Sequence, residues 1–350
     1  MDNHSNNYTT ISKLKKTKHV ESHMKDRKDL EKFLEAMPVD WLLAGEPFVK
    51  YRTLTDLLGM HQICKEVAET QKLIRTHRLI KQIFDKQNEY GYWGTPTDIY
   101  TWWPKKDTTF WLLGVLADFG FTREERRIAR ACEYVFSTQL LSGGFGCAPP
   151  PVPYDCFTGI LTESLAKLGY TSDSRLKEAY EWLVPRQRLD GGFWCKNTGL
   201  PGRQREKEPS CAFATLCVLG ALVQNPELRK SEIARKSTEF LFECWENRGK
   251  IKYAGHDSQI GRGWEKLKYP FTDYRILKYL DVLSQLESAR KDLRMIPILD
   301  LLLTKKDEKG CFYAESVHKV WSDFDFGQKK SPSRWLTLIV YLVAKRVGEK

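Results

Sequence analysis

The sequence lacks any long run of apolar residues. No stretch of its 350 residues approaches the roughly 18 to 20 consecutive apolar residues that a membrane span requires. The N-terminal segment is rich in charge but has no apolar centre, so it does not resemble a secretory signal. We therefore expect neither a transmembrane nor an exported protein.

Cysteine is present, but not in the patterns that disulfide frameworks or zinc ribbons need. The nine cysteines are odd in number, scattered along the chain and never spaced as C-x-x-C. This distribution argues against both kinds of cross-link and is typical of a reducing compartment. The sequence thus predicts a cytoplasmic protein.

A strong excess of one charge is also missing. Lys and Arg number 56 against 45 Asp and Glu, which gives a formal net charge of +11. This excess is mild for the length, and no homeodomain, RRM, KH or zinc-finger pattern accompanies it, so we expect no nucleic-acid partner. Hydrophobic residues at 41% and charged residues at 29% are typical of a globular chain.

What the sequence does contain is a repeat. Residues 1–28 are polar, basic and aperiodic, and they are predicted to form a disordered tail. Between residues 29 and 350, helical patterns alternate with a turn that joins glycine to an aromatic residue. Copies of this turn occupy residues 91–94, 143–146, 191–194 and 310–313, with a weaker copy at 251–254.

The helical patterns on the two sides of each turn differ in character. A one-sided, amphipathic pattern precedes the turn and a more apolar pattern follows it. The amphipathic segments are 29–43, 72–88, 127–140, 175–189, 232–246 and 290–305, and the apolar segments are 47–58, 107–119, 155–168, 210–223, 272–286 and 332–347. Helices that are apolar nearly all round belong inside. About six hairpins of this kind predict an all-α fold, an α/α toroid (α6/α6 barrel) with an inner and an outer ring.

The turn also carries a family resemblance. Segments 139–145 and 187–194 have the form Gln-x-x-x-Gly-x-Phe or Gln-x-x-x-Gly-x-Phe-Trp. Over roughly residues 30–350 the chain resembles the squalene-cyclase and protein-prenyltransferase superfamily, and most of all its small single-barrel squalene-cyclase-like members from bacteria and archaea. The resemblance implies a toroid that takes a small-molecule isoprenoid or lipid. An isomerase or intramolecular transferase activity is compatible with it, but the motif itself does not decide whether the chain is an enzyme.

Class II cyclases of this family protonate an alkene or epoxide with a carboxylic acid at the start of an inner helix. The matching segment here is Tyr154-Asp155-Cys156-Phe157. The resemblance implies that Asp155 is the proton donor and that Cys156 and Cys211 are its thiol partners. The match is incomplete, because the chain has no Asp-x-Asp-Asp motif. Asp155 is also suited to capping a helix N-terminus, a role worth ~1 kcal/mol that can coexist with catalysis.

Aromatic and basic residues gather near the starts of the predicted inner helices. In a toroid these starts converge on one mouth, where aromatic walls with a few cationic tips suit an isoprenoid chain with a diphosphate or carboxylate head. The alternative for the aromatic residues is ordinary core filling. The candidate binding residues are Trp102, Trp103, Trp111, Tyr154, Phe157, Arg203, Phe213, Tyr274, Arg275, Arg334 and Trp335.

The prenyltransferase branch of the superfamily implies a zinc ion. Arg203 and Cys211 match its pattern, but Pro209 stands at the aspartate position and Arg334 at the histidine position. A catalytic zinc site normally has three protein ligands, and only one of the family's three is present. We therefore expect no metal and no other cofactor, with zinc as the alternative that a prenyltransferase would require.

These observations lead to one expected function and two alternatives. The first is a terpenoid (squalene) cyclase-like protein that cyclises a linear isoprenoid by proton initiation. The second is a non-catalytic isoprenoid-binding or scaffold protein on the same fold, and the third is a diverged protein similar to a prenyltransferase β-subunit. The sequence leaves open the substrate, the oligomeric state and any peripheral contact with a membrane.

Overall fold

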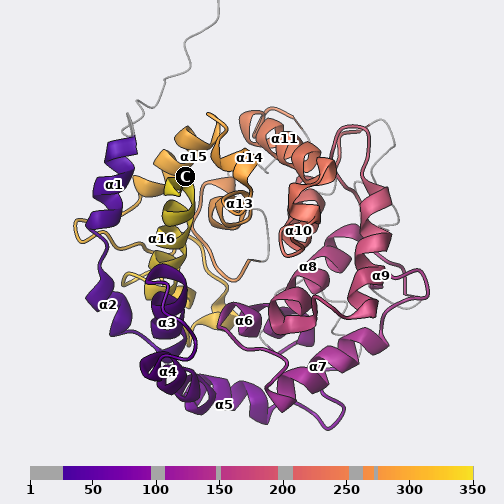
Figure 1. Cartoon of the computed structure of the whole chain (residues 1–350), viewed down its shortest axis with the longest axis horizontal. Helices are drawn as coiled ribbons and strands as arrows, with labels where there is room; N and C mark the ends of the chain where they lie inside the picture. The colour runs from indigo at the N-terminus through magenta and orange to yellow at the C-terminus, as the bar shows by residue number, and fades with distance from the viewer. Residues whose placement is uncertain are drawn as a thin grey trace, which may run out of the picture.

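The chain forms two concentric rings of helices. The computed structural model describes residues 27–95, 107–146, 151–195, 208–251, 263–271 and 275–349. In these ranges the regular structure is helical, and pairing between extended segments is limited to isolated bridges. Figure 1 shows the rings viewed along the barrel, with one set of helices around the centre and a second set outside it. The predicted α/α toroid is confirmed.

Inner and outer helices alternate along the chain. The inner ring consists of α3 (Pro47–Arg52) with its π-helical continuation η1 (Thr53–Leu57), α6 (Thr109–Asp118), α8 (Asp155–Leu165), α10 (Ala212–Leu222), α13 (Ile276–Leu283) and α16 (Arg334–Gly348). The outer ring consists of α1 (Arg27–Glu35) and α2 (Val39–Leu43), α4 (Lys65–Thr76) and α5 (Arg78–Asp85), α7 (Arg126–Ser137), α9 (Ser174–Leu183), α11 (Glu232–Glu246), and α14 (Glu287–Arg290) and α15 (Met295–Leu303). The last inner helix, α16, packs against α1, α3 and α13 and so closes the ring.

Several predicted outer helices are interrupted. The segment predicted at 72–88 belongs to two helices, α4 and α5, because His77 between them has extended backbone angles (φ −61°, ψ 135°). The predicted helix 29–43 is divided between α1 and α2, with Pro38 immediately before α2. The α-helical part of α9 ends at Leu183, and a short 3-10 turn, η4 (Val184–Arg186), carries the chain to the next turn motif.

In the turn copies at residues 91–94, 143–146 and 191–194, the glutamine four residues before the first glycine joins neighbouring hairpins. Its side-chain amide donates one hydrogen bond to the glycine carbonyl four residues later and another to a carbonyl at the start of the next outer helix. For Gln139 these acceptors are Gly143 and Arg175, and for Gln187 they are Gly191 and Ile233. Gly143 has a φ of 91°, and a Cβ on it would lie 2.5 Å from the Glu178 carbonyl oxygen of α9, so the turn requires glycine here.

The aromatic residue of each turn is fixed to the following inner helix. The backbone amides of Trp93, Phe145, Phe193 and Phe312 each donate to a threonine hydroxyl, on Thr109, Thr158, Thr215 and Thr337 respectively. These threonines lie in the first or second turn of α6, α8, α10 and α16. The motif therefore positions the start of each of these inner helices against the turn before it.

Candidate functional site: a central cavity with buried charges

A small cavity lies among the inner helices. It has a volume of about 50 Å³, and its walls include the aromatic side chains of Phe110, Trp111, Phe213, Tyr269 and Phe271. A second cavity of about 370 Å³ adjoins it and shares Asp118, Lys167 and Phe271 with it. The second cavity is lined largely by residues from the C-terminal halves of the inner helices and the loops that follow them.

Charged side chains from different inner helices meet where the two cavities join. Lys278 of α13 contacts both carboxylate oxygens of Glu163 of α8, at 2.6 and 2.8 Å. Lys167, which follows α8, donates to Glu163 at 2.7 Å and to Asp118 of α6 at 3.0 Å. The hydroxyl of Tyr269 donates to the other oxygen of Asp118 at 2.9 Å. These contacts form a continuous ion-pair network across the barrel.

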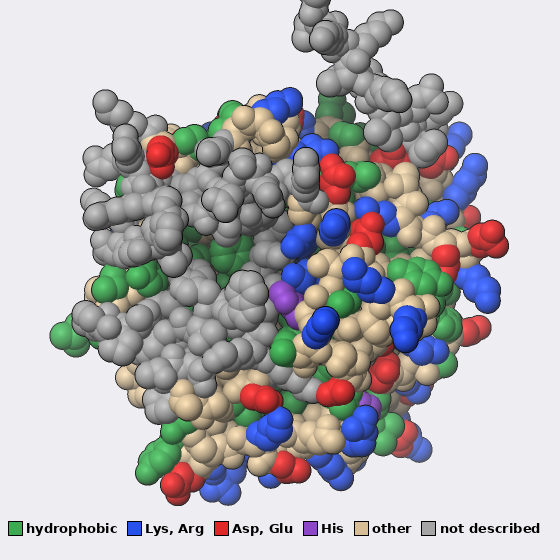
Figure 2. Space-filling view, turned by 180° about the vertical axis from the view of Figure 1, so that it is seen from behind, with side chains coloured by type: hydrophobic (Ala, Val, Ile, Leu, Met, Phe, Trp, Pro, Cys, Tyr) green, Lys and Arg blue, Asp and Glu red, His purple; other side chains and the backbone are tan. Residues whose placement is uncertain are grey.

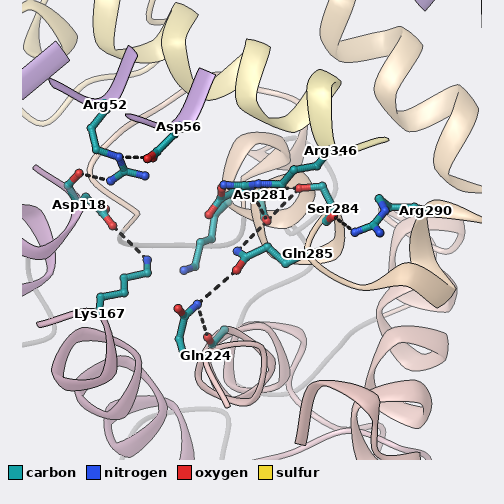
Figure 3. Close-up of polar contacts among 12 residues, drawn as sticks. Arg52, Asp56, Asp118, Lys167, Gln224, Asp281, Ser284, Gln285, Arg290 and Arg346 are labelled. Carbon is teal, nitrogen blue, oxygen red and sulfur yellow. Dashed lines mark hydrogen bonds and ion pairs between the residues drawn. The ribbon is translucent and has the colours of Figure 1, made fainter. Parts of the chain in front are cut away.

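The network continues around the wider cavity. Figure 3 shows Arg52 reaching Asp56 and the end of α6, while Arg346 of α16 approaches Asp281 of α13. The Arg346 guanidinium donates to an Asp281 carboxylate oxygen at 2.8 Å. The side chains in this view point inward from opposite sides of the ring. Along the barrel axis, the small cavity thus has aromatic walls, and the wider cavity beside it is lined by ion pairs.

Cationic neighbours keep the carboxyl groups of this network ionised. Burial by itself would raise the pKa of Glu163, but Lys167 and Lys278 together hold that pKa below its ordinary value. Burial likewise opposes ionisation of Asp281, and Arg346, Lys167 and Lys278 lower its pKa below the ordinary value. The Glu163 carboxylate fits beside α10 because Gly220 has no side chain, since a Cβ there would lie 2.4 Å from Glu163 Oε2.

Asp155 lies at the other end of α8, in the first turn, and its side chain is fully buried. One carboxylate oxygen accepts from Arg186 Nε at 2.6 Å, and the other accepts from the Trp194 backbone amide at 3.2 Å. Burial raises the pKa of Asp155 to about 6, although Arg186 and the Trp194 amide lower it in part. Asp155 lines neither of the two cavities and lies about 12 Å along α8 from Glu163, at 1.5 Å per residue.

The two candidate thiol partners of Asp155 make their own contacts elsewhere. Cys156 Sγ lies 3.0 Å from Cys195 Sγ. Cys211 is the N-cap of α10, and its sulfur accepts from the Ala214 amide at 3.4 Å. The negative charge of Asp155 is among the groups that help to raise the pKa of Cys211 to about 12, after burial and the nearby Cys195. Cys211 is therefore near Asp155 without bonding it.

The predicted aromatic binding residues divide into wall and core. Trp111 and Phe213 line the small cavity, and Trp335 lines the wider one. Phe157 is a core residue whose ring stacks on Phe110 with the centroids 4.6 Å apart. Tyr154 is the half-buried N-cap of α8. Trp111, Phe213 and Trp335 are themselves buried core residues, so their role in binding stays a prediction.

Two of the predicted cationic binding residues, Arg275 and Arg334, donate to backbone carbonyls and do not line the cavities. Arg275 donates to the Gly263 carbonyl at 2.6 Å, and Arg334 donates to the Trp41 carbonyl at 2.9 Å while its guanidinium lies over the Trp41 ring. Neither residue lines the two central cavities. Four further candidates, Trp102, Trp103, Arg203 and Tyr274, lie outside the described residues.

A second carboxyl group with a raised pKa lies at the start of the last inner helix. Asp325 accepts from the Trp335 amide at 3.2 Å, and its Oδ1 atom is buried without a hydrogen-bond partner. Burial and the neighbouring Glu46 carboxylate raise the pKa of Asp325 to about 6. Glu46 precedes α3 and also has a buried oxygen, Oε2, without a partner.

Sequence reasoning missed the ionic part of the site. The signal was present, because Asp118, Glu163, Lys167, Lys278 and Asp281 interrupt or end helices that are otherwise apolar. Charged residues inside such helices must be paired when they are buried. Which residues pair across the barrel follows only from the ring closure. The Arg186 partner of Asp155 gave no comparable signal, since it comes from the end of an outer helix.

A family model matches the cyclase branch of the predicted superfamily. The model of the squalene-hopene cyclase C-terminal domain matches residues 101–276, which carry α6 to α11 and include both Asp155 and Glu163. The chain belongs to this family. It is thus a terpene cyclase-like protein, as the turn motif implied.

Solved structures extend the likeness over most of the chain at low identity. A protein from Actinoplanes is 13% identical, with 93% of this chain and 100% of that chain covered and a TM-score of 0.47. The type II terpene cyclase MstE from Scytonema is 12% identical, with 91% and 98% covered and a TM-score of 0.45. A glycosyl hydrolase of family 88 from Bacteroides vulgatus is 11% identical, with 92% and 99% covered and a TM-score of 0.48. The names of these proteins describe different activities, so the similarity assigns none of them to this chain. A comparison with curated proteins gives no significant match.

Two further findings concern metals and membranes. In the part of this squalene-hopene cyclase family member that the structure describes, no group of three His, Cys, Asp or Glu residues is arranged to hold a metal ion. Within the same ranges, none of the helices combines the length and the apolar character needed to cross a bilayer. On the face shown in Figure 2, the described Lys and Arg side chains are interspersed with Asp and Glu side chains rather than gathered in one block.

Proposed function

We propose that this protein takes a linear isoprenoid into the centre of its barrel, where the cavity of about 50 Å³ must widen to receive it, and cyclises it by class II, proton-initiated chemistry. The observation that carries the proposal is the aromatic wall formed by Phe110, Trp111, Phe213, Tyr269 and Phe271. Such a wall suits an apolar polyene, and aromatic faces stabilise the cations that a cyclisation passes through. The family match to a squalene-hopene cyclase domain supports the same substrate class.

Asp155 is the proposed proton donor. A pKa near 6 leaves part of its carboxyl population protonated close to neutral pH. Transfer of this proton to the terminal alkene carbon forms a tertiary cation, and successive alkenes then attack to close the rings. The reaction ends when the last cation loses a proton or captures water. Arg186 and the Trp194 amide stabilise the carboxylate left behind, which solvent then reprotonates.

The distance between Asp155 and Glu163 is compatible with a long substrate. A geranylgeranyl chain is longer than the distance of about 12 Å along α8 between Asp155 and Glu163. One end of the chain would meet the acid near the start of α8, and the remainder would lie along Trp111 and Phe213. The ion pairs that Glu163 makes with Lys278 and Lys167 form a polar boundary, which limits how far an apolar chain can extend along the barrel axis.

A second candidate function, isoprenoid binding without turnover, is favoured by one specific observation. Both Asp155 oxygens are already engaged, one by Arg186 and one by the Trp194 amide. In this alternative the carboxylate is a structural clasp between the start of α8 and the turn that follows α9. Nothing in the described residues favours the third alternative, prenyl transfer, which requires a zinc site.

The experiment that separates these functions compares two acidic residues. Purified protein is incubated with squalene or geranylgeraniol in detergent micelles, and extracted products are identified by gas chromatography and mass spectrometry. The variants are Asp155→Asn and, as a matched control, Asp325→Asn, since both acids lie near the start of an inner helix and have a pKa near 6, although Asp155 is buried and Asp325 half-buried. Native mass spectrometry of the same samples measures bound probe.

We expect wild type and Asp325→Asn to form cyclic product, and Asp155→Asn to bind the probe but lose at least a hundredfold in turnover, the scale of a lost general acid. Bound probe without product in the wild type would contradict the cyclase and support the binding protein. Stoichiometric bound zinc would instead favour prenyl transfer. A protein that neither binds nor converts either probe would overturn the proposal of an isoprenoid site.

A further inference from the structure

Two cysteine sulfurs approach each other closely beside Asp155. Cys156 in the first turn of α8 and Cys195 after the turn motif have their Sγ atoms 3.0 Å apart. Both are free thiols in this structure. A disulfide bond has an S–S length of about 2.05 Å, so a shift of about 1 Å would bring the two sulfurs into bonding range.

Hydrogen bonds of the neighbouring residues fix the positions of the two chain segments that carry the thiols. The Asp155 carboxylate accepts from the Trp194 amide, and these residues are the immediate neighbours of Cys156 and Cys195. On the other side, the Phe193 amide donates to Thr215 of α10, and the Phe193 carbonyl accepts from the Cys211 amide at 2.8 Å. The segment that carries Cys195 is therefore attached to the starts of both α8 and α10. The approach of the sulfurs follows from the fold rather than from the two side chains alone.

The two thiols differ in exposure, and this gives them different chemical roles. Cys156 is buried, whereas Cys195 is half-exposed. Burial and the neighbouring Cys195 raise the pKa of the Cys156 thiol well above its ordinary value, so Cys156 stays protonated. Cys195 is the sulfur that an oxidant in solution can reach.

We propose that Cys156 and Cys195 form an oxidisable dithiol site, which a hydroperoxide converts to an intramolecular disulfide. The Cys195 thiolate attacks one peroxide oxygen, the O–O bond breaks, and with one proton the leaving group becomes water, or an alcohol from an organic hydroperoxide. Cys195 is then a sulfenic acid. The Cys156 sulfur attacks that sulfur, the S–OH bond breaks, and the Cys156 proton joins the departing hydroxide as water. Two thiols are oxidised and one peroxide is reduced.

The bond would close a covalent loop around one hairpin. It would span 39 residues of sequence, and these include α9 and the turn motif after it. A cross-link of this length restricts the unfolded chain and thereby stabilises the folded one. The proposal depends on the thiol geometry alone, so it stands or falls independently of whether Asp155 catalyses a reaction.

The test uses the full-length chain, reduced with dithiothreitol, desalted, exposed to a small excess of hydrogen peroxide and then treated with N-ethylmaleimide. Trypsin places Cys195 in its own peptide, residues 189–196, and Cys156 in the peptide 131–167, which also contains Cys132 and Cys147, so fragment-ion spectra assign the partner of Cys195. The variants are Cys195→Ser and Cys156→Ser. The matched control is Cys64→Ser, which changes another half-exposed cysteine.

We expect wild type and Cys64→Ser to lose the mass of two hydrogens and to yield a disulfide that joins these two peptides, reversed by dithiothreitol. The oxidised protein should have a Tm higher by about 5 °C than the reduced one. In Cys156→Ser the chemistry should stop at a Cys195 sulfenic acid that dimedone traps. If Cys156→Ser fails to fold, Cys195→Ser, at the half-exposed position, carries the test.

Three results would overturn the proposal. The first is a Cys195 that remains fully reactive toward N-ethylmaleimide after peroxide has oxidised other cysteines. The second is a disulfide from Cys195 to Cys211 or to a second chain. The third is an unchanged yield of intramolecular disulfide in Cys195→Ser.

Discussion

The pKa values of carboxyl groups are shifted in opposite directions at the two ends of the inner helices. Near the helix starts, the pKa values of Asp155 and Asp325 are raised to about 6. Toward the far ends, those of Glu163 and Asp281 are lowered below their ordinary values. Burial acts in the same direction on all four groups, so it does not explain the difference.

The number of cationic neighbours explains why the pKa values are raised at one end and lowered at the other. Glu163 contacts two lysine ammonium groups, whereas Asp155 contacts one guanidinium that is itself partly exposed. Asp325 has another carboxylate, Glu46, as its charged neighbour. The far end of the barrel is therefore built to keep its acids ionised, and the near end is built to let them carry a proton. Proton-initiated chemistry requires the second condition.

The largest expected effect comes from breaking the ion pairs at the far end. Glu163→Gln removes the direct ion-pair partner of the buried Lys278 ammonium, which should lower the free energy of unfolding by about 3–5 kcal/mol. Urea denaturation at pH 7 measures the change. Glu181→Gln, which removes an exposed partner of Lys177, should cost less than about 1 kcal/mol. Equal losses in the two variants would contradict a special role for the central network.

The pH dependence of stability should have opposite signs at the two ends. Asp325 binds its proton more tightly in the folded than in the unfolded chain, so its contribution to stability falls as the pH rises from about 4 to about 6. Asp325→Asn lacks this pH-dependent loss of stability. The free energy of unfolding of the variant minus that of wild type should therefore rise by about 3 kcal/mol between pH 4 and pH 7.

Glu163 should show the reverse. Its folded pKa is lowered, so its stabilisation is complete above the ordinary value of 4.5 and is lost as the pH falls through the folded value. Denaturant titrations of wild type, Asp325→Asn and Glu163→Gln from about pH 2 to pH 7 measure both slopes. Parallel profiles for the two variants would show that the ends do not differ.

A smaller effect is expected from Arg186→Gln, which makes the near end less cationic. Without the guanidinium, the pKa of Asp155 should rise above 6, by about one to two units. The pH profile of product formation should move upward by the same amount, because Asp155 keeps its proton to higher pH. Arg186 lies over the Trp182 ring. Arg175→Gln is the control, since Arg175 likewise lies over an aromatic ring, Phe136, but pairs with Glu133 and Asp173. An unshifted profile in Arg186→Gln would remove Asp155 as the titrating acid.

The sequence predicts the fold better than the site for a physical reason. Periodicity and the turn motif are local, so Gln139 and Gly143 are enough to indicate a hairpin, and in the structure the Gln139 side chain donates to the Gly143 carbonyl. The start of α8 at Asp155 was predictable in the same way. Helix interruptions such as the one at His77 were not, because no proline or glycine marks that position.

The charge partners depend on ring closure. Glu163 and Lys278 are 115 residues apart, and the Tyr269 hydroxyl reaches Asp118 across 151 residues. No spacing rule connects such pairs. Arg334 illustrates the converse, since its position at the start of an inner helix suggested a cavity, while its guanidinium lies over Trp41 of the outer ring.

The most direct test of the account is a carbon-13 NMR titration of the side-chain carboxyl groups. Selectively labelled aspartate and glutamate are followed from pH 3 to 8, and Asp155→Asn and Glu163→Gln assign the two resonances. The account predicts a midpoint for Asp155 near pH 6 and one for Glu163 below its ordinary value of 4.5. A midpoint for Asp155 at or below the ordinary aspartate value would contradict it, because the acid proposed to start the reaction would then be ionised at neutral pH.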